Sequence, residues 1–189
     1  MRASRALRRG FTLLELMVVV FIIGLITAAA VITFGGDRRD TELDKEAERM
    51  HALLGYVREQ AELQTRDYGL RINARLYSFV VFDALQNQWR TVDEDNALRE
   101  REFPEGLQPS VVLEGRPIVL ETKKKKVEDF KPQVMVFANG DLSSFEITLK
   151  REGGDEKARV YTDEQTNILV MLPGETEPRG AVIHTAQRR

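Results

Sequence analysis

The chain has 189 residues, a formal net charge of −2 and no cysteine. This length accommodates one ordinary domain with an appendage, and the missing cysteine excludes disulfides, thiolate metal sites and cysteine nucleophiles. Without residues 1–10, which carry four arginines, 24 basic residues face 30 acidic ones, a balance of −6; an acidic body argues against a general nucleic-acid binder, so nucleic acid is not an expected partner.

An apolar run of 24 residues, 11–34, follows the arginines and contains a single charged residue, Glu15. As a helix this run is roughly 36 Å long, which exceeds the hydrocarbon core of about 30 Å. The arginines should stay in the cytoplasm and place the remaining chain in the periplasm. A secretory signal cleaved near Ala30 is the alternative, because residues 27–30 are small. Glu15, however, would then lie inside the signal core for no reason.

Glu15 needs a physical explanation, because a charged residue in the middle of a bilayer costs roughly 2.5–3.5 kcal/mol. Near the cytoplasmic edge the cost is smaller, and the carboxylate can reach the headgroups. Alternatively, it awaits a cationic partner inside an assembly, since buried charges persist when they are paired. The sequence alone leaves both interpretations open.

Residues 9–16, with the letters RGFTLLEL, resemble the processing site of type IV prepilins and type II secretion pseudopilins. The resemblance implies that a prepilin peptidase removes the basic leader, residues 1–10, by cutting between Gly10 and Phe11. It also implies that Phe11 is then N-methylated, and that Glu15 forms a salt bridge with the amino terminus of a neighbouring subunit. The implied partners are the peptidase, the major pseudopilin, other minor pseudopilins and the inner-membrane assembly platform.

A second helical segment follows the apolar run, and it is the periplasmic half of the predicted helical spine, residues 35–66. Gly35 and Gly36 predict a kink or short break at its start, because each glycine lowers helix stability by about 1 kcal/mol. Thr41 is the candidate cap. Apolar residues then recur at helical spacing and form one stripe, which we expect to pack on its own domain rather than on a partner: Leu43, Ala47, Met50, Leu54, Val57 and Ala61.

After residue 67 the pattern changes to strands, at 70–72, 77–82, 88–92, 111–113, 118–120, 134–137, 145–149, 159–161 and 168–171. Three hairpins are predicted. The first joins 77–82 to 88–92 through a loop containing Asn87, and the second joins 111–113 to 118–120. The third joins 134–137 to 145–149 around Asn139-Gly140, the strongest short hairpin signal. We expect the tail after Pro173 to be mobile.

The strand region, with Trp89 after an aromatic strand and the Asn139-Gly140-Asp141 turn, resembles the domain of H-type minor pseudopilins of type II secretion (GspH) and of FimT-type minor pilins. The expected fold is α+β: a long amino-terminal helical spine, transmembrane in its first half, then a β-rich antiparallel periplasmic domain at 67–189. The implied function is a minor pseudopilin that helps export folded proteins, with secreted cargo as a further partner. The rivals are a type IV minor pilin, including one for DNA uptake, and a membrane-anchored periplasmic enzyme or binding protein.

The remaining polar residues predict no catalytic site, no metal site and no bound cofactor. His51 is expected on the surface, and His184 lies far from it in sequence, so zinc is not expected. The acidic residues 93–95 lack the spacing of a calcium loop, and a solvated charge run is favoured. Lysines 123–126 could meet anionic lipid or an acidic partner, although a solvated loop is favoured. The basic tail, with Arg179, Arg188 and Arg189, is short for DNA binding.

Overall fold

The computed structural model describes residues 13–122 and 131–180, with side chains for 13–27 and from residue 41 onward within those ranges. The chain divides into two compact units, residues 1–40 and 41–189. Helix α1, Leu13–Gln64, begins in the first unit and ends in the second. All strands belong to the second unit, which therefore holds the folded domain.

Helix α1 is continuous through the glycine pair, so the predicted short break is absent. Gly35 and Gly36 are helical, and Thr41 lies inside the helix instead of capping a new one. The physical reason is that glycine weakens a helix but keeps its backbone donor, whereas proline removes a donor and clashes with the preceding turn. No proline occurs between Leu13 and Gln64, so the hydrogen-bonded ladder can continue.

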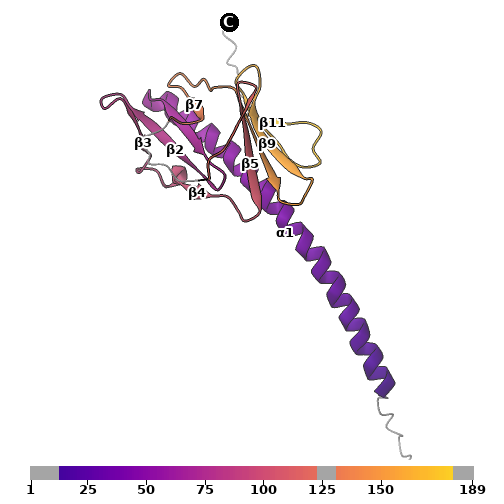
Figure 1. Cartoon of the computed structure of the whole chain (residues 1–189). Helices are drawn as coiled ribbons and strands as arrows, with labels where there is room; N and C mark the ends of the chain where they lie inside the picture. Colours follow the sequence, from indigo (N-terminus) through magenta and orange to yellow (C-terminus); the bar gives the residue numbers. More distant parts are fainter. Residues whose placement is uncertain (1–12, 123–130, 181–189) are drawn as a thin grey trace, which may run out of the picture. The chain divides into compact units, whose positions relative to one another are not determined.

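Two antiparallel sheets follow the helix, which confirms the α+β class (Figure 1). The first sheet has the order β3-β2-β1-β7, with β4 also paired to β2; its strands are β1 (Tyr68–Ile72), β2 (Leu76–Asp83), β3 (Gln88–Thr91), β4 (Arg101–Glu102) and β7 (Val134–Val136). The second sheet has the order β11-β10-β9-β8-β5-β6; its strands are β5 (Leu107–Leu113), β6 (Arg116–Ile118), β8 (Phe145–Arg151), β9 (Lys157–Thr162), β10 (Ile168–Met171) and β11 (Arg179–Gly180). A short 3-10 helix, η1 (Asn96–Leu98), precedes β4.

Two of the predicted hairpins are confirmed. Strands β2 and β3 pair from Asp83 opposite Gln88, and Asn87 in their loop has a φ of 52°. Strands β5 and β6 pair from Leu113 opposite Arg116, which leaves a two-residue turn with positive φ at both positions. Turns of this kind match the twist of the flanking strands, so both hairpins follow from local sequence.

The third predicted hairpin is wrong, because β7 and β8 lie in different sheets. The turn itself forms: Phe137 N–H donates to the Asp141 carbonyl, and Gly140 N–H donates to the Phe137 carbonyl. Only one bridge, Val136 opposite Leu142, continues the pairing, and β8 pairs instead with β5 and β9. Gly140 has a φ of 83° and lies against Glu62, where a Cβ would meet the Glu62 carboxylate. The turn thus crosses from one sheet to the other beside α1.

The tail is ordered further than predicted. Arg179 and Gly180 form β11 on the edge of the second sheet, opposite Val170 and Leu169 of β10. Main-chain hydrogen bonds to β10 hold this segment in place. The sequence has no strand-like periodicity here, so this pairing was not predicted. Residues 181–189, including His184, Arg188 and Arg189, lie outside the described residues.

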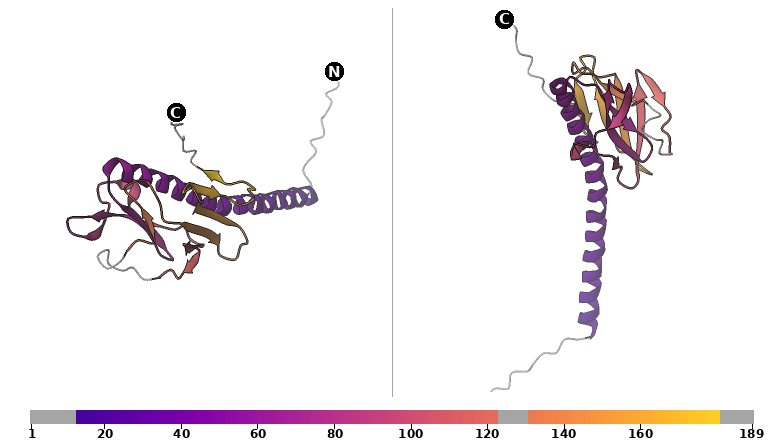
Figure 2. Two further views of the ribbon diagram at one scale, coloured as in Figure 1. Left: turned by 90° about the horizontal axis from the view of Figure 1, so that it is seen from above. Right: turned by 90° about the vertical axis from the view of Figure 1, so that its left-hand side faces the viewer.

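The apolar stripe of α1 is the centre of the core, as predicted. Its six residues are all at most 1% exposed: Leu43, Ala47, Met50, Leu54, Val57 and Ala61. They belong to one cluster with inward-facing side chains of both sheets, among them Phe79 of the first sheet and Ile147 of the second. Figure 2 shows the carboxyl half of α1 lying along the strands. The helix therefore packs on its own domain.

A buried polar cluster lies inside this interface. Glu46 is 1% exposed and accepts two hydrogen bonds, from the Tyr77 hydroxyl at 2.7 Å and from Arg49 Nη1 at 2.7 Å. Burial, with the hydrogen bond to Glu46, raises the pKa of Tyr77 far above its ordinary range. A buried carboxylate is tolerable only when its oxygens have such donors, so this cluster fixes how α1 lies on β2.

Replacing Tyr77 with Phe should lower the free energy of unfolding by about 1–3 kcal/mol, because the buried Glu46 carboxylate loses a donor. Urea unfolding of residues 37–189 measures this. Tyr161→Phe is the control: its hydroxyl has no hydrogen bond among the described residues, so the change should stay within about 0.5 kcal/mol. Because the folded-state pKa of Tyr77 is raised, the difference between wild type and Tyr77→Phe should narrow as pH rises above about 10. Equal stability at pH 7 would contradict the role of this hydrogen bond.

Candidate functional site

The first candidate site is the amino-terminal part of α1, where every described side chain is exposed. Twelve large hydrophobic residues between Leu13 and Ile26 have exposed fractions of 45–78%: Leu13, Leu14, Leu16, Met17, Val18, Val19, Val20, Phe21, Ile22, Ile23, Leu25 and Ile26. Consecutive residues project around the whole circumference of a helix, so this apolar surface has no polar face. Within the part of the chain that the structure describes, no helix has both the length and the hydropathy that crossing a membrane requires.

Glu15 is the acidic residue in the first turn of α1. A carboxylate in that position is favoured by the positive end of the helix dipole, which gives a local reason for an acid in an otherwise apolar segment. The residues that sequence analysis grouped with it, Gly10 and Phe11, lie outside the described residues. The structure therefore places the acid but not the predicted cleavage site.

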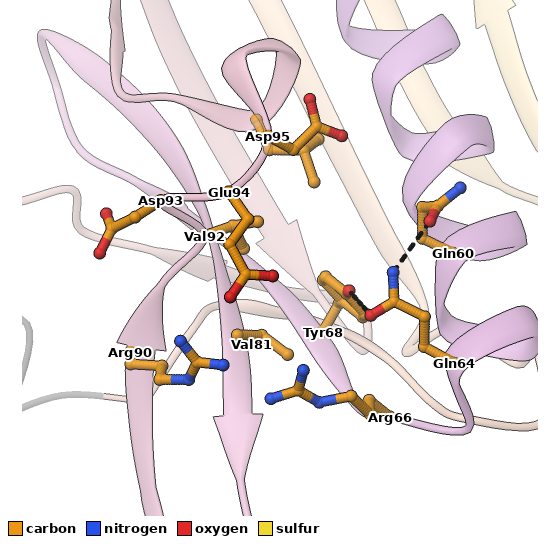
Figure 3. A pocket seen from close by; sticks show the side chains of 11 residues that line it. Gln60, Gln64, Arg66, Tyr68, Val81, Arg90, Val92, Asp93, Glu94 and Asp95 are labelled. Carbon is orange, nitrogen blue, oxygen red and sulfur yellow. Dashed lines mark hydrogen bonds between the residues drawn. The ribbon is translucent and has the colours of Figure 1, made fainter.

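The second candidate site is a polar cavity at the other end of α1, with a volume of about 230 Å³. It lies between the last turns of the helix, strands β1 to β3 and the loop before η1 (Figure 3). The cavity is lined by Tyr68, Val81, Val92 and Leu98 together with the more polar residues Gln60, Gln64, Arg66, Arg90 and 93–95. No periodicity or motif in the sequence indicates this group, because its members come from three separate segments.

The end of α1 determines where Arg66 lies. Its backbone N–H donates to the Ala61 carbonyl at 3.2 Å, and Thr65 between them has a φ of 52°. This is the Schellman arrangement, which usually has glycine at the left-handed position; a β-branched residue there is strained. Arg90 projects from β3, opposite Val81 of β2. The guanidinium groups of Arg66 and Arg90 consequently point toward one another beneath Glu94 (Figure 3).

Hydrogen bonds hold the walls of the cavity. The Tyr56 hydroxyl donates to Asp95 Oδ2 at 2.7 Å, while Asp95 Oδ1 accepts from Ala97 N–H at 2.8 Å and caps η1. The bond to Asp95 raises the pKa of Tyr56. The Tyr68 hydroxyl donates to Gln64 at 2.9 Å, and burial raises its pKa. Both phenols therefore stay protonated at neutral pH and keep these hydrogen bonds.

The other residues considered from the sequence are His51, the acidic residues 93–95 and Arg179, and most of them make hydrogen bonds or ion pairs within the domain. His51 is partly exposed, with Nε2 3.0 Å from the Ile168 carbonyl of β10, a contact over 117 residues of sequence that the prediction of a surface histidine did not include. Asp93 and Glu94 are exposed as predicted, whereas Asp95 is partly buried and bonded. Arg179 pairs with Glu48 at 3.0 Å and with Glu175. Among the described residues no group of three His, Cys, Asp or Glu side chains could hold a metal, and lysines 123–126 lie outside them.

Two family models match the chain. The prokaryotic N-terminal methylation motif matches residues 5–31, which include the predicted cleavage site and Glu15. The model of the type II transport protein GspH matches residues 46–166, which is more than half of the chain. The second match begins within the buried stripe of α1 and ends before β10.

Individual relatives agree with these matches. The type II secretion system protein H of Pseudomonas aeruginosa is 36% identical over 84% of this chain and 90% of its own length. The protein of the same name from Aeromonas hydrophila is 33% identical over 89% of this chain and 95% of its own. The solved structure of the minor pseudopilin EpsH from the type 2 secretion system of Vibrio cholerae aligns with a TM-score of 0.59 and 25% identity, covering 71% of this chain and 99% of that one. The chain therefore belongs to the GspH family of type II transport proteins.

Proposed function

We propose that the chain is a minor pseudopilin of a type II secretion system, a subunit of the filament that helps move folded proteins across the outer membrane. The observation that supports this most directly is the exposed apolar surface of α1, from Leu13 to Ile26, with one acid in its first turn. A surface of this kind is unfavourable in water and is stabilised in lipid or against other helices. Membership of the GspH family supports a role for this helix in a type II secretion system.

The proposed topology has one membrane crossing. Residues 1–10 are the leader that prepilin peptidase removes in the cytoplasm, and residues 11–34 cross the inner membrane. Residues 35–66 continue as helix in the periplasm, followed by the domain at 67–189. The four arginines before the run support this orientation, and the methylation motif over residues 5–31 supports cleavage between Gly10 and Phe11 with methylation of Phe11.

Glu15 supplies the register of assembly in this proposal. The freed amino group of Phe11 on one subunit and the Glu15 carboxylate of a neighbour attract by about 4 kcal/mol at 4 Å and an effective dielectric constant near 20. That attraction offsets much of the cost of desolvating both charges. Apolar contacts between parallel helices are not directional, so they supply cohesion but leave the axial offset loose. A charge pair fixes that offset.

The role of the subunit is mechanical and requires no cofactor. It leaves the bilayer laterally and joins the major pseudopilin and other minor pseudopilins on the inner-membrane assembly platform, and the growing filament then acts on the secreted cargo. Its own domain stands in the periplasm, where its surface selects neighbours. The described side chains suit this role, because they provide an apolar helix for cohesion and a polar cavity for contact.

Replacing Glu15 with Leu should leave membrane insertion and leader cleavage intact but reduce incorporation into sheared filaments at least about tenfold, which corresponds to a net pair energy of about 1.4 kcal/mol. Quantitative immunoblotting of filament and membrane fractions measures it. Glu15→Gln should show the same loss, since it keeps the shape and removes the charge, while Met17→Leu should incorporate normally. Normal incorporation of Glu15→Leu would refute the register role.

Replacing Gly10 with Val should block leader removal, because the peptidase must fit the residue before the cut. Mass spectrometry of the wild-type amino terminus should find N-methylphenylalanine at Phe11, whereas the variant should retain residues 1–10. A membrane-anchored binding protein would function equally well with either residue. A mature wild-type chain that starts near Val31, or that keeps its leader in cells with active peptidase, would overturn the proposed processing.

A further inference from the structure

Strand β3 ends the first sheet, and its outer side pairs with no other strand of the described residues (Figure 1). A sheet edge of this kind presents unpaired main-chain N–H and C=O groups, to which an extended segment of another chain can add. The strand has four residues, Gln88–Thr91; the first is exposed and the other three are partly exposed. Solvent therefore reaches this edge of the sheet.

The hydrogen bonds of β2 determine which main-chain groups of β3 point outward. Successive residues of a strand direct these groups to alternate sides. Phe82 N–H donates to the Asp67 carbonyl, just before β1, so both neighbours of Phe82 direct their main-chain groups toward β3. Arg90 lies opposite the first of these neighbours and is directed toward β2. The main-chain groups of Trp89 and Thr91, on either side of Arg90, consequently point away from β2 in the plane of the sheet.

The edge of the second sheet at β5 and β6 is blocked by proline. Leu113 and Arg116 flank a two-residue turn and therefore exchange main-chain hydrogen bonds. By the same alternation, Pro117 is the outward-directed residue of β6, and Pro109 is directed to that side in the part of β5 that extends beyond β6. Proline has no N–H to donate, and its ring obstructs an added strand. Neither outward-directed residue of β3 is a proline, so that edge stays open.

The other edges are covered or very short. Ser143 N–H donates to the Met135 carbonyl at 3.0 Å, and Ser143 Oγ accepts from Met135 N–H at 2.9 Å, so residues 142–143 cover the outer side of β7. Strands β4 and β11 have two residues each. Among the described strands, β3 is therefore the edge most suited to strand addition.

The side chains beside this edge indicate which residue an added strand needs. Trp89 lies opposite Phe82, with ring centroids 5.2 Å apart. A strand added to β3 would place one of its own side chains next to Trp89 on the same face of the sheet. Aromatic and β-branched side chains are the favourable neighbours of an aromatic one across strands. Because Trp89 is partly exposed, it has surface left for such a contact.

We propose that β3 binds an extended segment of a neighbouring pseudopilin, which adds to the first sheet as a strand and places an aromatic or β-branched residue beside Trp89. The proposal rests on the filament role given above. Two outward-directed residues offer few main-chain hydrogen bonds, and each bond adds little net affinity in water. Such a contact suits a partner that the membrane and the filament already hold alongside at high effective concentration, rather than a protein that diffuses freely.

A second copy of this chain is the less suitable partner. Two-fold symmetry would pair two β3 strands antiparallel. Overlap of all four residues would place Trp89 opposite Arg90, but of these two only Trp89 directs its main-chain groups outward, so a ladder cannot form in that register. Shifted registers lose part of an overlap that is already short. The edge therefore favours a different chain.

The test uses the full-length chain in cells that express the whole secretion system. A photo-crosslinking benzoylphenylalanine at Gln88, the exposed residue of β3, should give a product with one other pseudopilin. Thr91→Pro should reduce that product about fivefold or more, because an outward N–H is lost and the ring obstructs the added strand. Thr91→Ala keeps the N–H and is the matched control, with a change below about twofold. The same probe at Val119, which is 95% exposed and follows the proline-blocked β6, should give no such product.

Disulfide mapping distinguishes strand addition from other contacts, and the chain has no cysteine of its own to interfere. Gln88 directs its main-chain groups toward β2, so the residue opposite it on an added strand is a close neighbour without main-chain hydrogen bonds to it. With Gln88→Cys, single cysteines along the crosslinked segment should form disulfides at every second position, since side chains of a strand alternate between faces. Disulfides without that alternation would overturn the proposal.

Two further measurements keep the outcomes separate. Circular dichroism melting of purified Thr91→Pro should match wild type, because the Thr91 N–H takes no part in the β2–β3 ladder; disulfide mapping needs no proline variant and decides independently of this result. A Gln88 product that is insensitive to Thr91→Pro, or one with cargo, lipid or a second copy, also contradicts the proposal. Wild-type chain that enters filaments without a Gln88 product removes only strand addition, whereas wild-type chain absent from filaments removes the pseudopilin role with it.

Discussion

The burial of one helical stripe against two separate sheets holds this domain together. The two sheets do not share a strand, and the described structure joins them through α1, the turn at residues 137–141 and their loops. Six helix side chains fill the space between inward-facing residues of both sheets. Burying apolar area contributes roughly 25 cal/mol per Å², so the stripe is the dominant cohesive element. The positions of the surface residues of the domain therefore depend on this packing.

Polar contacts then determine how each element lies on that stripe. Glu46 of α1 accepts a hydrogen bond from the Tyr77 hydroxyl of β2, and His51 of α1 is hydrogen-bonded to the Ile168 carbonyl of β10. Arg58 Nη1 reaches the Thr166 carbonyl at 3.3 Å, near the turn between β9 and β10. These bonds link the helix to both sheets along its length, and hydrogen bonds are directional where apolar contacts are not.

The sequence predicted those elements whose structure depends on residues close together along the chain. Spacings of three and four residues identified the whole buried stripe, and turn-forming residues, Asn87 and Gly115, identified the β2–β3 and β5–β6 hairpins. Strand pairing between distant segments was not predicted. Strand β8 pairs with β5, more than thirty residues away, so the Asn139-Gly140 turn connects two sheets. The surroundings of His51 and the meeting of Arg66 with Arg90 depend on the same tertiary contacts, which no local pattern encodes.

Helix α1 carries two kinds of apolar surface, one exposed between Leu13 and Ile26 and one buried from Leu43 to Ala61. The boundary between anchor and domain therefore does not coincide with the end of the helix. A truncated fragment that starts after Gln64 would expose the inner faces of both sheets to water and aggregate. A graft of this domain onto another helix must accordingly join upstream of Leu43, so that the whole buried stripe is kept.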